Sequence, residues 1–309
     1  MNTLHLKYAL EVEKTGSITK AADRLYMNQP HLSKTIRDLE GALGSAIFKR
    51  TPKGMVPTKK GAEFLAGAKN ILAQLEKMES LFAGEDSQRA SLRITVPRAS
   101  YISHAFTEFI KSLPEGVKMD VDYRETNSVR AMENVMEGHS DLGVIRFQSD
   151  YTNYFESLLA EKNLRFEPVR EFEYLVLFSG NHPLAKCDVV ECAKLRHYAE
   201  VTHGDSTLPS APPRRGKDAP QGGEGGEIAI YERGSQFEIL NSAQTTYMWV
   251  SPMPSEVLAR FSLVQRKSDA PNNRHRDFLI SRDGYRFSKE DDAFAEKLRE
   301  IVENTETRT

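Results

Sequence analysis

Cysteine and tryptophan are scarce in this chain of 309 residues, which contains two cysteines, Cys187 and Cys192, and one tryptophan. So few cysteines exclude a small secreted scaffold held together by disulfides, and they fit a reducing cytoplasm. No uninterrupted apolar run approaches the roughly 18 residues that span a membrane. A leader with a charged region followed by an apolar region is also missing. We therefore expect a cytoplasmic protein with no membrane partner.

Signatures of catalysis are missing as well. The sequence contains no P-loop, no G-x-S-x-G, no H-E-x-x-H and no zinc-spaced cluster of cysteine and histidine. Its eight histidines are scattered along the chain. We therefore expect that the protein is not an enzyme and holds neither a metal nor a cofactor.

Two short helices are predicted within residues 16–43. The hydroxyl of Ser17 can accept a backbone N–H that the first turn of a helix leaves free, and this helix is expected to end near Leu25. Asn28 can cap a second helix, in which Pro30 occupies the first turn without losing a hydrogen bond. The apolar residues of the second helix repeat at the spacing of a buried stripe: Leu32, Ile36, Leu39 and Leu43.

The opposite face of the second helix carries Gln29, Ser33, Lys34 and Arg37, which are residue types that bind base edges and phosphates in a major groove. The basic, turn-rich segment 48–58 is predicted to form a wing. Residues 1–60 hold 11 Lys or Arg against 5 Asp or Glu, whereas the whole chain has a net charge of −2. A basic head on an acidic body is typical of a DNA-binding module. A helical hairpin with merely solvated charges is the alternative.

The motifs of this segment resemble the winged helix-turn-helix of LysR-type transcriptional regulators. They are G-S-I-T-K-A-A at residues 16–22, N-Q-P-H-L-S-K-T-I at 28–36 and I-F-K-R-T at 47–51. The resemblance implies an N-terminal all-α winged helix-turn-helix domain over residues 1–60 that binds double-stranded DNA. The DNA contacts that we expect come from Thr19, Gln29, Pro30, Ser33, Lys34, Arg37, Arg50, Thr51 and Lys53.

Residues 61–90 are predicted to form a linker helix, because no proline lies between Gly61 and Gly84. Six apolar residues in it follow a heptad spacing: Phe64, Ala68, Ile71, Leu75, Met78 and Phe82. This seam can pack on its own domain or on a second subunit. The family resemblance implies the second arrangement, a homodimer that forms a homotetramer and reads an interrupted palindrome.

From residue 91 onward, strands and helices alternate. Strands at 92–96, 117–123 and 142–145 with helices at 101–113 and 128–137 predict a parallel sheet with helices on both faces. A second unit is predicted to begin near 169, with strands 174–178, 198–202 and 247–250 and helices 189–195, 235–243 and 255–261. The chain then returns to the first unit through 263–267, a strand at 277–281 and a helix at 289–302.

This order resembles the α/β two-lobe effector domain of LysR-type regulators, which is similar to periplasmic solute-binding proteins. The implied domain covers 91–309, with lobe 1 at about 91–168 and 268–309 and lobe 2 at about 169–267. Ligands of such folds bind at the carboxyl ends of strands, between the lobes. That rule selects Arg98, Ala99, Ser100, Tyr101, Thr126, Asn127, Ser128, Arg146, Thr202 and His203.

Two of these residues, Ser100 and Ser128, precede predicted helices whose N-termini suit an anion, and Arg98 and Arg146 add positive charge. We therefore expect a small anionic effector. The alternative is that the serines only cap helices and the arginines are only solvated.

Two segments of lobe 2 depart from the family pattern. In residues 204–226, 10 of 23 residues are Gly or Pro, which predicts a mobile loop or a disordered insertion. In 243–254 the bulky run Thr245-Thr246-Tyr247-Met248-Trp249 replaces a glycine-rich turn and is expected to narrow the cleft.

Taken together, these patterns predict a sequence-specific transcriptional regulator in which an effector shifts the population of lobe or subunit orientations, with RNA polymerase as a further partner. A redox-sensing regulator that uses Cys187 and Cys192 is one alternative. Their spacing on a predicted helix would point the two thiols to different faces, which favours ordinary reduced cysteines. A ligand-binding α/β protein with no regulatory role is the other alternative.

Overall fold

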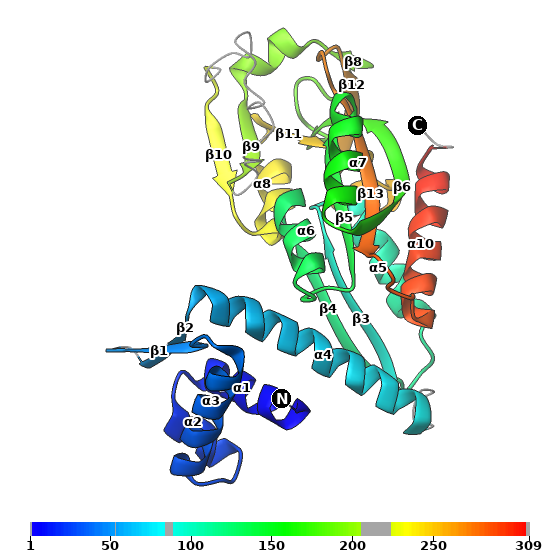
Figure 1. Ribbon diagram of the computed structural model, residues 1–309. Helices are drawn as coiled ribbons and strands as arrows, with labels where there is room; N and C mark the ends of the chain where they lie inside the picture. Colours follow the sequence, from blue (N-terminus) through cyan, green and yellow to red (C-terminus); the bar gives the residue numbers. More distant parts are fainter. Residues whose placement is uncertain (1, 53, 84–88, 205–223, 307–309) are drawn as a thin grey trace. The chain divides into compact units, whose positions relative to one another are not determined.

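The computed structural model describes residues 2–52, 54–83, 89–204 and 224–306. The chain divides into two compact units, Met1–Arg89 with Glu137–His139 and Ala90–Met136 with Ser140–Thr309 (Figure 1). None of the helices in the described ranges has the length and apolar character needed to cross a membrane.

The first unit contains a helix-turn-helix built on a small apolar core. Its elements are α1 (Thr3–Thr15), α2 (Ile18–Arg24), α3 (Gln29–Leu43), β1 (Phe48–Thr51), β2 (Gly54–Pro57) and α4 (Lys59–Ala83). Both predicted caps are confirmed, because the side chains of Ser17 and Asn28 accept from the backbone N–H groups of Lys20 and His31 at 3.4 and 2.9 Å. The core includes Ala9, Val12, Ala21, Ala22, Leu32, Ile36, Leu39, Ile47, Phe48 and Leu65.

The wing follows α3 directly. Strands β1 and β2 pair antiparallel, so the predicted all-helical head needs a correction: its wing is a two-stranded β-ribbon. The carboxylate of Glu40 on α3 accepts from the backbone N–H groups of Ile47 and Phe48 at 2.8 and 3.0 Å, which attaches the wing to the helix. Leu43, predicted to be in the buried stripe, is 40 % exposed because it is the last residue of α3 and lies beyond the core.

The second unit contains two sheets. The first has the order β4-β3-β5-β13-β6. Its strands are β3 (Arg89–Val96), β4 (Lys118–Glu125), β5 (Leu142–Gln148), β6 (Leu164–Glu173) and β13 (Arg274–Arg282). The predicted parallel arrangement is confirmed for β3 and β5, whereas the returning strand β13, whose direction was not predicted, inserts antiparallel to both β5 and β6. Strand β6 and helix α7 (Thr152–Glu161) were not predicted.

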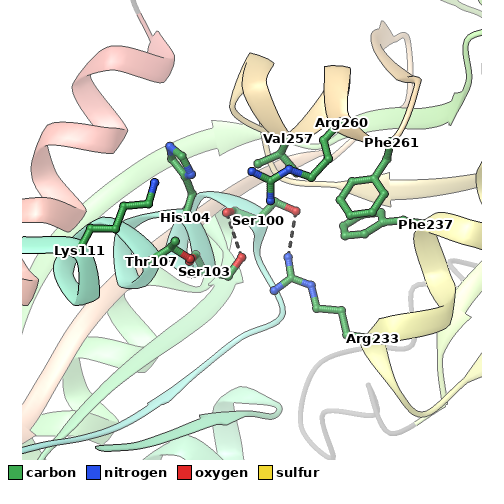
Figure 2. A pocket seen from close by; sticks show the side chains of 10 residues that line it. All are labelled: Ser100, Ser103, His104, Thr107, Lys111, Arg233, Phe237, Val257, Arg260 and Phe261. Atoms are coloured by element: carbon green, nitrogen blue, oxygen red, sulfur yellow. Dashed lines mark hydrogen bonds between the residues drawn. The ribbon is translucent and has the colours of Figure 1, made fainter. Parts of the chain in front are cut away.

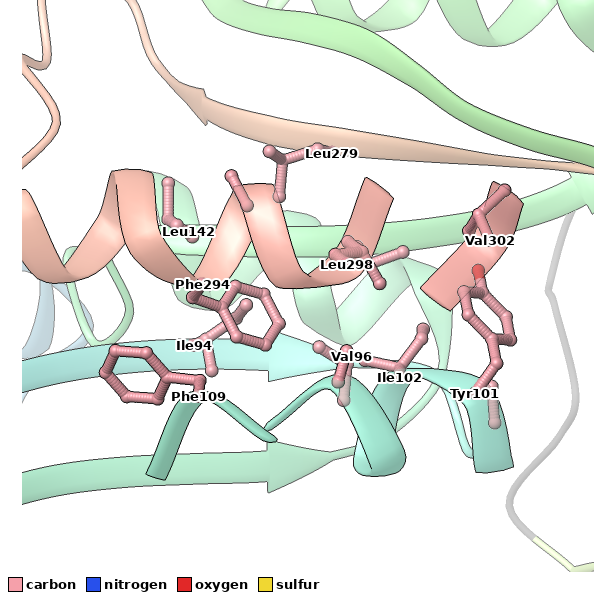
Figure 3. Packing of buried hydrophobic residues seen from close by; sticks show 14 of the residues in the cluster. Ile94, Val96, Tyr101, Ile102, Phe109, Leu142, Leu279, Phe294, Leu298 and Val302 are labelled. Carbon is pink, nitrogen blue, oxygen red and sulfur yellow. The ribbon is translucent and has the colours of Figure 1, made fainter. Parts of the chain in front are cut away.

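Helices cover both faces of this sheet. On one face lie α5 (Ser100–Ser112) and α10 (Lys289–Glu306), and on the other α6 (Ser128–Met136) and α7. Alternate residues of β5 serve the two faces, as a strand requires: Leu142 packs on the α5 side and Ile145 on the α6 side. Figure 3 shows Ile94, Phe109, Leu279 and Phe294 meeting in the core on the α5 side.

The second sheet has the order β10-β9-β11-β7-β12-β8. Its strands are β7 (Leu175–Ser179), β8 (Val189–Val190), β9 (Ala199–His203), β10 (Glu227–Ile230), β11 (Thr246–Val250) and β12 (Leu263–Ser268), with helices α8 (Gln236–Ser242) and α9 (Ser255–Arg260). The first sheet, which contains β3, is the centre of lobe 1. The second sheet, which contains β7, is the centre of lobe 2.

Two predictions for lobe 2 are wrong. The helix expected at 189–195 is a short strand, β8, followed by the 3₁₀ helix Cys192–His197. The bulky run at 245–249 does not narrow a cleft, because β11 lies inside the sheet and buries Tyr247 and Met248 in the cores on its two faces. The predicted loop at 204–226 falls mostly at 205–223, outside the described residues.

Candidate functional site

The predicted DNA-contacting residues of α3 share one exposed face. Gln29, Pro30, Lys34 and Arg37 are exposed and Ser33 is half-buried. The opposite face of the helix buries Leu32, Thr35, Ile36 and Leu39. A face with this composition offers amide, hydroxyl and cationic donors, and the core on the other side fixes its orientation.

The two cations of this face are available to phosphates. Within the described ranges, no carboxylate lies within ion-pair distance of Lys34 or Arg37, and Arg37 Nε donates to the backbone oxygen of Ser33 at 3.3 Å. Thr19 is exposed in the first turn of α2, and Arg50 is exposed on the wing. Thr51 instead donates its hydroxyl to the Gly54 oxygen at 2.9 Å and closes the wing. Lys53 lies outside the described residues.

An exposed tyrosine next to this face was not predicted. Tyr26 lies in the turn between α2 and α3, is 98 % exposed and has a φ of 52°. This left-handed conformation is uncommon for a residue with a large side chain. No sequence pattern indicated it, because the turn was defined only by the caps around it.

The predicted seam of α4 divides into two parts. Ala68 is buried with Leu72 against Leu6 of α1, and Phe64 packs beside them. Ile71 and Met78 are 46 and 51 % exposed, and Leu75 is half-buried. The side chain of Phe82 lies outside what the structure describes. Part of the seam therefore packs on its own unit, and the exposed part remains available to a partner.

A cross-lobe bridge joins the two lobes of the second unit through Arg233, Glu125 and Ser100. Arg233 begins the 3₁₀ helix Arg233–Ser235 of lobe 2. Its guanidinium forms an ion pair with Glu125 at the end of β4 and donates to the hydroxyl of Ser100, at the start of α5, at 2.9 Å. The Arg233 and Glu125 side chains are only 16 and 18 % exposed, so solvent screens the pair weakly.

A second contact across the lobes lies nearby. Arg98, one of the predicted effector residues, donates from Nη2 to the backbone oxygen of Tyr231 at 3.5 Å. Arg98 and Ser100 were predicted as effector-binding residues, whereas Arg233 and Glu125 were not predicted. The only local signal was the position of Glu125 next to the predicted Thr126, and its partner lies 108 residues further along the chain.

Two predicted effector residues belong to a buried ionic cluster. Arg146 donates to Asp277 from Nε at 2.8 Å and from Nη2 at 2.6 Å, and these side chains are 9 and 0 % exposed. Tyr101 donates its hydroxyl to the same carboxylate. Burial, reinforced by the Asp277 carboxylate, raises the pKa of Tyr101 well above its ordinary value, so the phenol stays protonated. The prediction that Arg146 offers charge to an anion needs correction, because Asp277 neutralises it.

The predicted anion site at Ser128 also needs correction. Its hydroxyl donates to the Arg146 backbone oxygen at 2.7 Å and accepts from the Arg146 N–H at 2.8 Å, which ties α6 to β5. The capping role belongs to Asn127, whose side chain accepts from the Arg130 N–H at 2.9 Å.

The remaining predicted residues lie at the ends of strands and helices. Ala99 is the N-cap residue of α5, and the Thr126 N–H donates to the Val96 oxygen at 2.9 Å. Thr202 donates its hydroxyl to Glu227 at 2.7 Å. His203 ends β9 and is half-buried. None of these four residues forms part of the cross-lobe bridge.

A basic cavity of about 150 Å³ lies beside this bridge. Its walls are α5 on the lobe 1 side and α8, α9 and Arg233 on the lobe 2 side, as Figure 2 shows. Its cationic or potentially cationic side chains are His104, Lys111, Arg233 and Arg260.

Both cysteines are free thiols and half-buried. Burial raises the pKa of the Cys192 thiol, which lowers its thiolate fraction at neutral pH. A lower thiolate fraction makes a thiol less reactive towards oxidants, so this feature does not favour the redox alternative.

Comparisons with known proteins agree with the division of the chain into a helix-turn-helix unit and an α/β unit. The family model "Bacterial regulatory helix-turn-helix protein, lysR family" matches residues 4–62. The HTH-type transcriptional regulator CysB of Burkholderia cenocepacia is 26 % identical over 67 % of this chain and 64 % of its own length. The regulatory protein NocR of Agrobacterium tumefaciens is 28 % identical over 59 % of this chain and 57 % of its own. The matches thus span less than two thirds of these relatives.

Solved structures extend the likeness to nearly the whole chain. Full-length OxyR from Pseudomonas aeruginosa has a TM-score of 0.62 at 18 % identity, covering 97 % of this chain and 98 % of that one. ArgP from Mycobacterium tuberculosis has a TM-score of 0.65 at 18 % identity, covering 96 % of each chain. LysG from Corynebacterium glutamicum with bound effector Arg has a TM-score of 0.62 at 12 % identity, covering 98 % of this chain and 99 % of that one. The predicted fold class, a winged head with a linker helix and a two-lobe α/β domain, is confirmed.

Proposed function

We propose that this chain is a LysR-type transcriptional regulator that reads a specific double-stranded DNA sequence, and the match of residues 4–62 to the lysR-family model supports this. The observation that carries this proposal is the exposed face of α3, where Gln29, Ser33, Lys34 and Arg37 lie opposite the buried stripe. Gln29 and Ser33 would read base edges, and Lys34 and Arg37 would bind phosphates or guanine. Pro30 would position the first turn of the helix in the groove, with Thr19, Arg50, Thr51 and Lys53 at the flanks.

The proposed reader is a homodimer. The exposed part of the α4 seam, Ile71 and Met78, supports pairing through this helix. A two-fold dimer reads an interrupted palindrome. Association of two dimers into a tetramer would set the spacing of four heads, and contact with RNA polymerase would follow from that spacing.

A small effector bound between the lobes controls this dimer in our proposal. The cross-lobe bridge supports it, because Arg233 already holds one carboxylate, that of Glu125, at the junction of the lobes. A ligand with its own carboxylate would compete with Glu125 for the same guanidinium. Exchanging an internal partner for a ligand changes the relative free energies of the lobe arrangements, which is how a ligand shifts a population.

Selection of bound fragments from random duplex DNA tests the DNA-reading role. We expect the wild type to enrich an interrupted palindrome and the double variant Ser33→Ala/Lys34→Ala to lose this enrichment, because both residues lie on the exposed face of α3. The matched control is Lys69→Ala. Lys69 is a cation of α4 in the same unit, and it lies outside α3 and is paired with Glu13 at 3.0 Å.

The control variant should retain the same palindrome. If the wild type enriches no sequence at physiological salt, the head binds DNA only through its charge, and the ligand-binding alternative replaces the regulator. An enriched sequence that survives in Ser33→Ala/Lys34→Ala would show that α3 does not read it.

A further inference from the structure

The basic pocket beside the cross-lobe bridge brings together cationic side chains of both lobes, of which Lys111 and Arg260 are exposed to solvent. One wall is a single face of α5, formed by Ser103, His104, Thr107 and Lys111. Lobe 2 supplies Arg233 and Arg260 to the opposite wall. In Figure 2, Arg233 and Arg260 reach from lobe 2 towards α5. Cationic side chains from both lobes therefore converge on one cavity.

The lining of the pocket carries a net positive charge, although two of its cations have carboxylate partners outside the lining. None of the described side chains that line it is a carboxylate. Lys111 donates to Glu108 at 2.7 Å, and Arg233 pairs with Glu125, but both carboxylates lie outside the lining. No ion pair or hydrogen bond of the Arg260 side chain occurs within the described ranges.

The cavity also has an apolar wall. Phe237 of α8 and Phe261, just after α9, stack with ring centroids 4.6 Å apart. The volume of about 150 Å³ is below the roughly 300–1,000 Å³ of pockets for drug-sized ligands. The pocket therefore suits a small ligand, or the head group of a larger one, with an apolar portion against the two rings.

This pocket differs from the cleft predicted at the ends of the strands. Thr126, Arg146, Thr202 and His203 do not line it. Its wall on lobe 1 is the side of α5, and only Ser100 belongs both to the pocket and to the predicted effector residues.

We propose that the basic pocket binds a small phosphate-bearing anion. A phosphate group carries about −1.5 to −2 charges at pH 7 and offers three acceptor oxygens. Such a tetrahedral group accepts hydrogen bonds from several directions at once, which suits cationic donors on opposite walls, Lys111 of α5 and Arg260 of α9. A carboxylate offers only two acceptor oxygens, which lie in one plane, so it matches donors on opposite walls less well than a phosphate does.

Arg233 connects this site with the cross-lobe bridge. The same guanidinium lines the pocket and binds Glu125 and Ser100. An anion in the pocket would therefore alter the charge balance of the bridge, and the two sites would be coupled reciprocally. This inference goes beyond the proposed function, because phosphate binding does not require that the protein reads DNA.

Isothermal titration calorimetry with inorganic phosphate tests the site in the full-length protein. The titration is run at pH 7.5, with sodium chloride keeping the ionic strength constant. We expect saturable binding by the wild type, and at least tenfold weaker binding by Lys111→Gln and by Arg260→Gln, since each loses a charge-assisted hydrogen bond.

Two control variants separate this site from other cations. Lys194→Gln removes a lysine of lobe 2 that lies outside the pocket. It is a matched control, because Lys194 pairs with Glu191 at 2.7 Å and at i,i+3 spacing, as Lys111 pairs with Glu108. Lys34→Gln removes a phosphate-binding candidate of the DNA-binding head. Both controls should bind phosphate as the wild type does.

Absence of saturable binding by the wild type would overturn the proposal. Binding lost in Lys34→Gln but retained in Lys111→Gln and Arg260→Gln would overturn it too, because the head would then hold the anion. Neither result depends on the DNA selection, so failure of this site and failure of the proposed function are distinguishable.

Discussion

At the scale of single residues, two arginine–aspartate pairs of the second unit differ mainly in burial. Arg146 and Asp277 are 9 and 0 % exposed, and two guanidinium nitrogens reach the carboxylate. Arg124 and Asp122 have a similar two-nitrogen geometry but are 51 and 38 % exposed. Removing one partner of a buried pair leaves a charge without compensation in a medium of low dielectric constant, whereas water compensates an exposed one.

Asp277→Asn should therefore lower the free energy of unfolding of the second unit by about 3–5 kcal/mol, because Arg146 keeps its buried charge. The matched control Asp122→Asn should change it by no more than about 1 kcal/mol. Urea denaturation followed by tryptophan fluorescence measures both, since Trp249 lies in this unit. Equal losses in the two variants would contradict the role assigned to burial.

At the scale of elements, the start of α4 is held against the segment that leads into the wing. Thr58 donates its hydroxyl to the Ala46 oxygen at 2.7 Å and accepts from the Gly61 N–H at 2.9 Å. A Cβ atom on Gly61 would lie 1.9 Å from the backbone oxygen of Ile47. Glycine is required here by the close approach of two backbones.

We predict that Gly61→Ala lowers the stability of the DNA-binding head by at least about 2 kcal/mol, because the backbone must move to admit one methyl group. Gly41→Ala is the control. A Cβ atom on Gly41, which lies in α3, would meet nothing within 4 Å, so helix propensity should raise stability by up to about 1 kcal/mol. Amide hydrogen exchange of the head at equilibrium reports both changes. A stable Gly61→Ala head would show that α4 can move away from Ile47 at little cost.

At the scale of the whole effector unit, two lobes with separate cores meet at a few polar contacts. Each lobe has apolar clusters on both faces of its own sheet. The cross-lobe bridge of Arg233, Glu125 and Ser100 joins them. Small polar contacts of this kind permit relative motion of lobes more readily than a large apolar interface does.

Arg233→Gln should therefore increase hydrogen exchange in the first turn of α5 and around the 3₁₀ helix Arg233–Ser235, because the lobes separate more often. Glu125→Gln should do the same, and the double variant should add little, since both substitutions remove one interaction. Arg266→Gln is the control, because Arg266 is half-buried like Arg233 but lies within lobe 2, where its side chain donates to the Gln265 backbone oxygen at 2.8 Å. Additive effects of the two bridge substitutions would mean that they do not share one interaction.

Much of the head was predictable because its determinants are local. The caps at Ser17 and Asn28 act within three residues, and the stripe of Leu32, Ile36 and Leu39 follows from helical periodicity. These features also decide which face of α3 stays exposed. The error at Leu43 arose because periodicity alone does not say where a core ends.

The amino-acid sequence by itself determined the basic winged head, the linker helix and the alternation of strands and helices, since each depends on residues a few positions apart. Only the tertiary structure decided the pairs Arg146–Asp277 and Arg233–Glu125, whose partners lie 131 and 108 residues apart. It also decided that β13 runs antiparallel and that the basic pocket draws residues from α5, α8 and α9. The physical reason is that strand order and lobe crossing bring distant side chains together, and local spacing carries no information about which will meet.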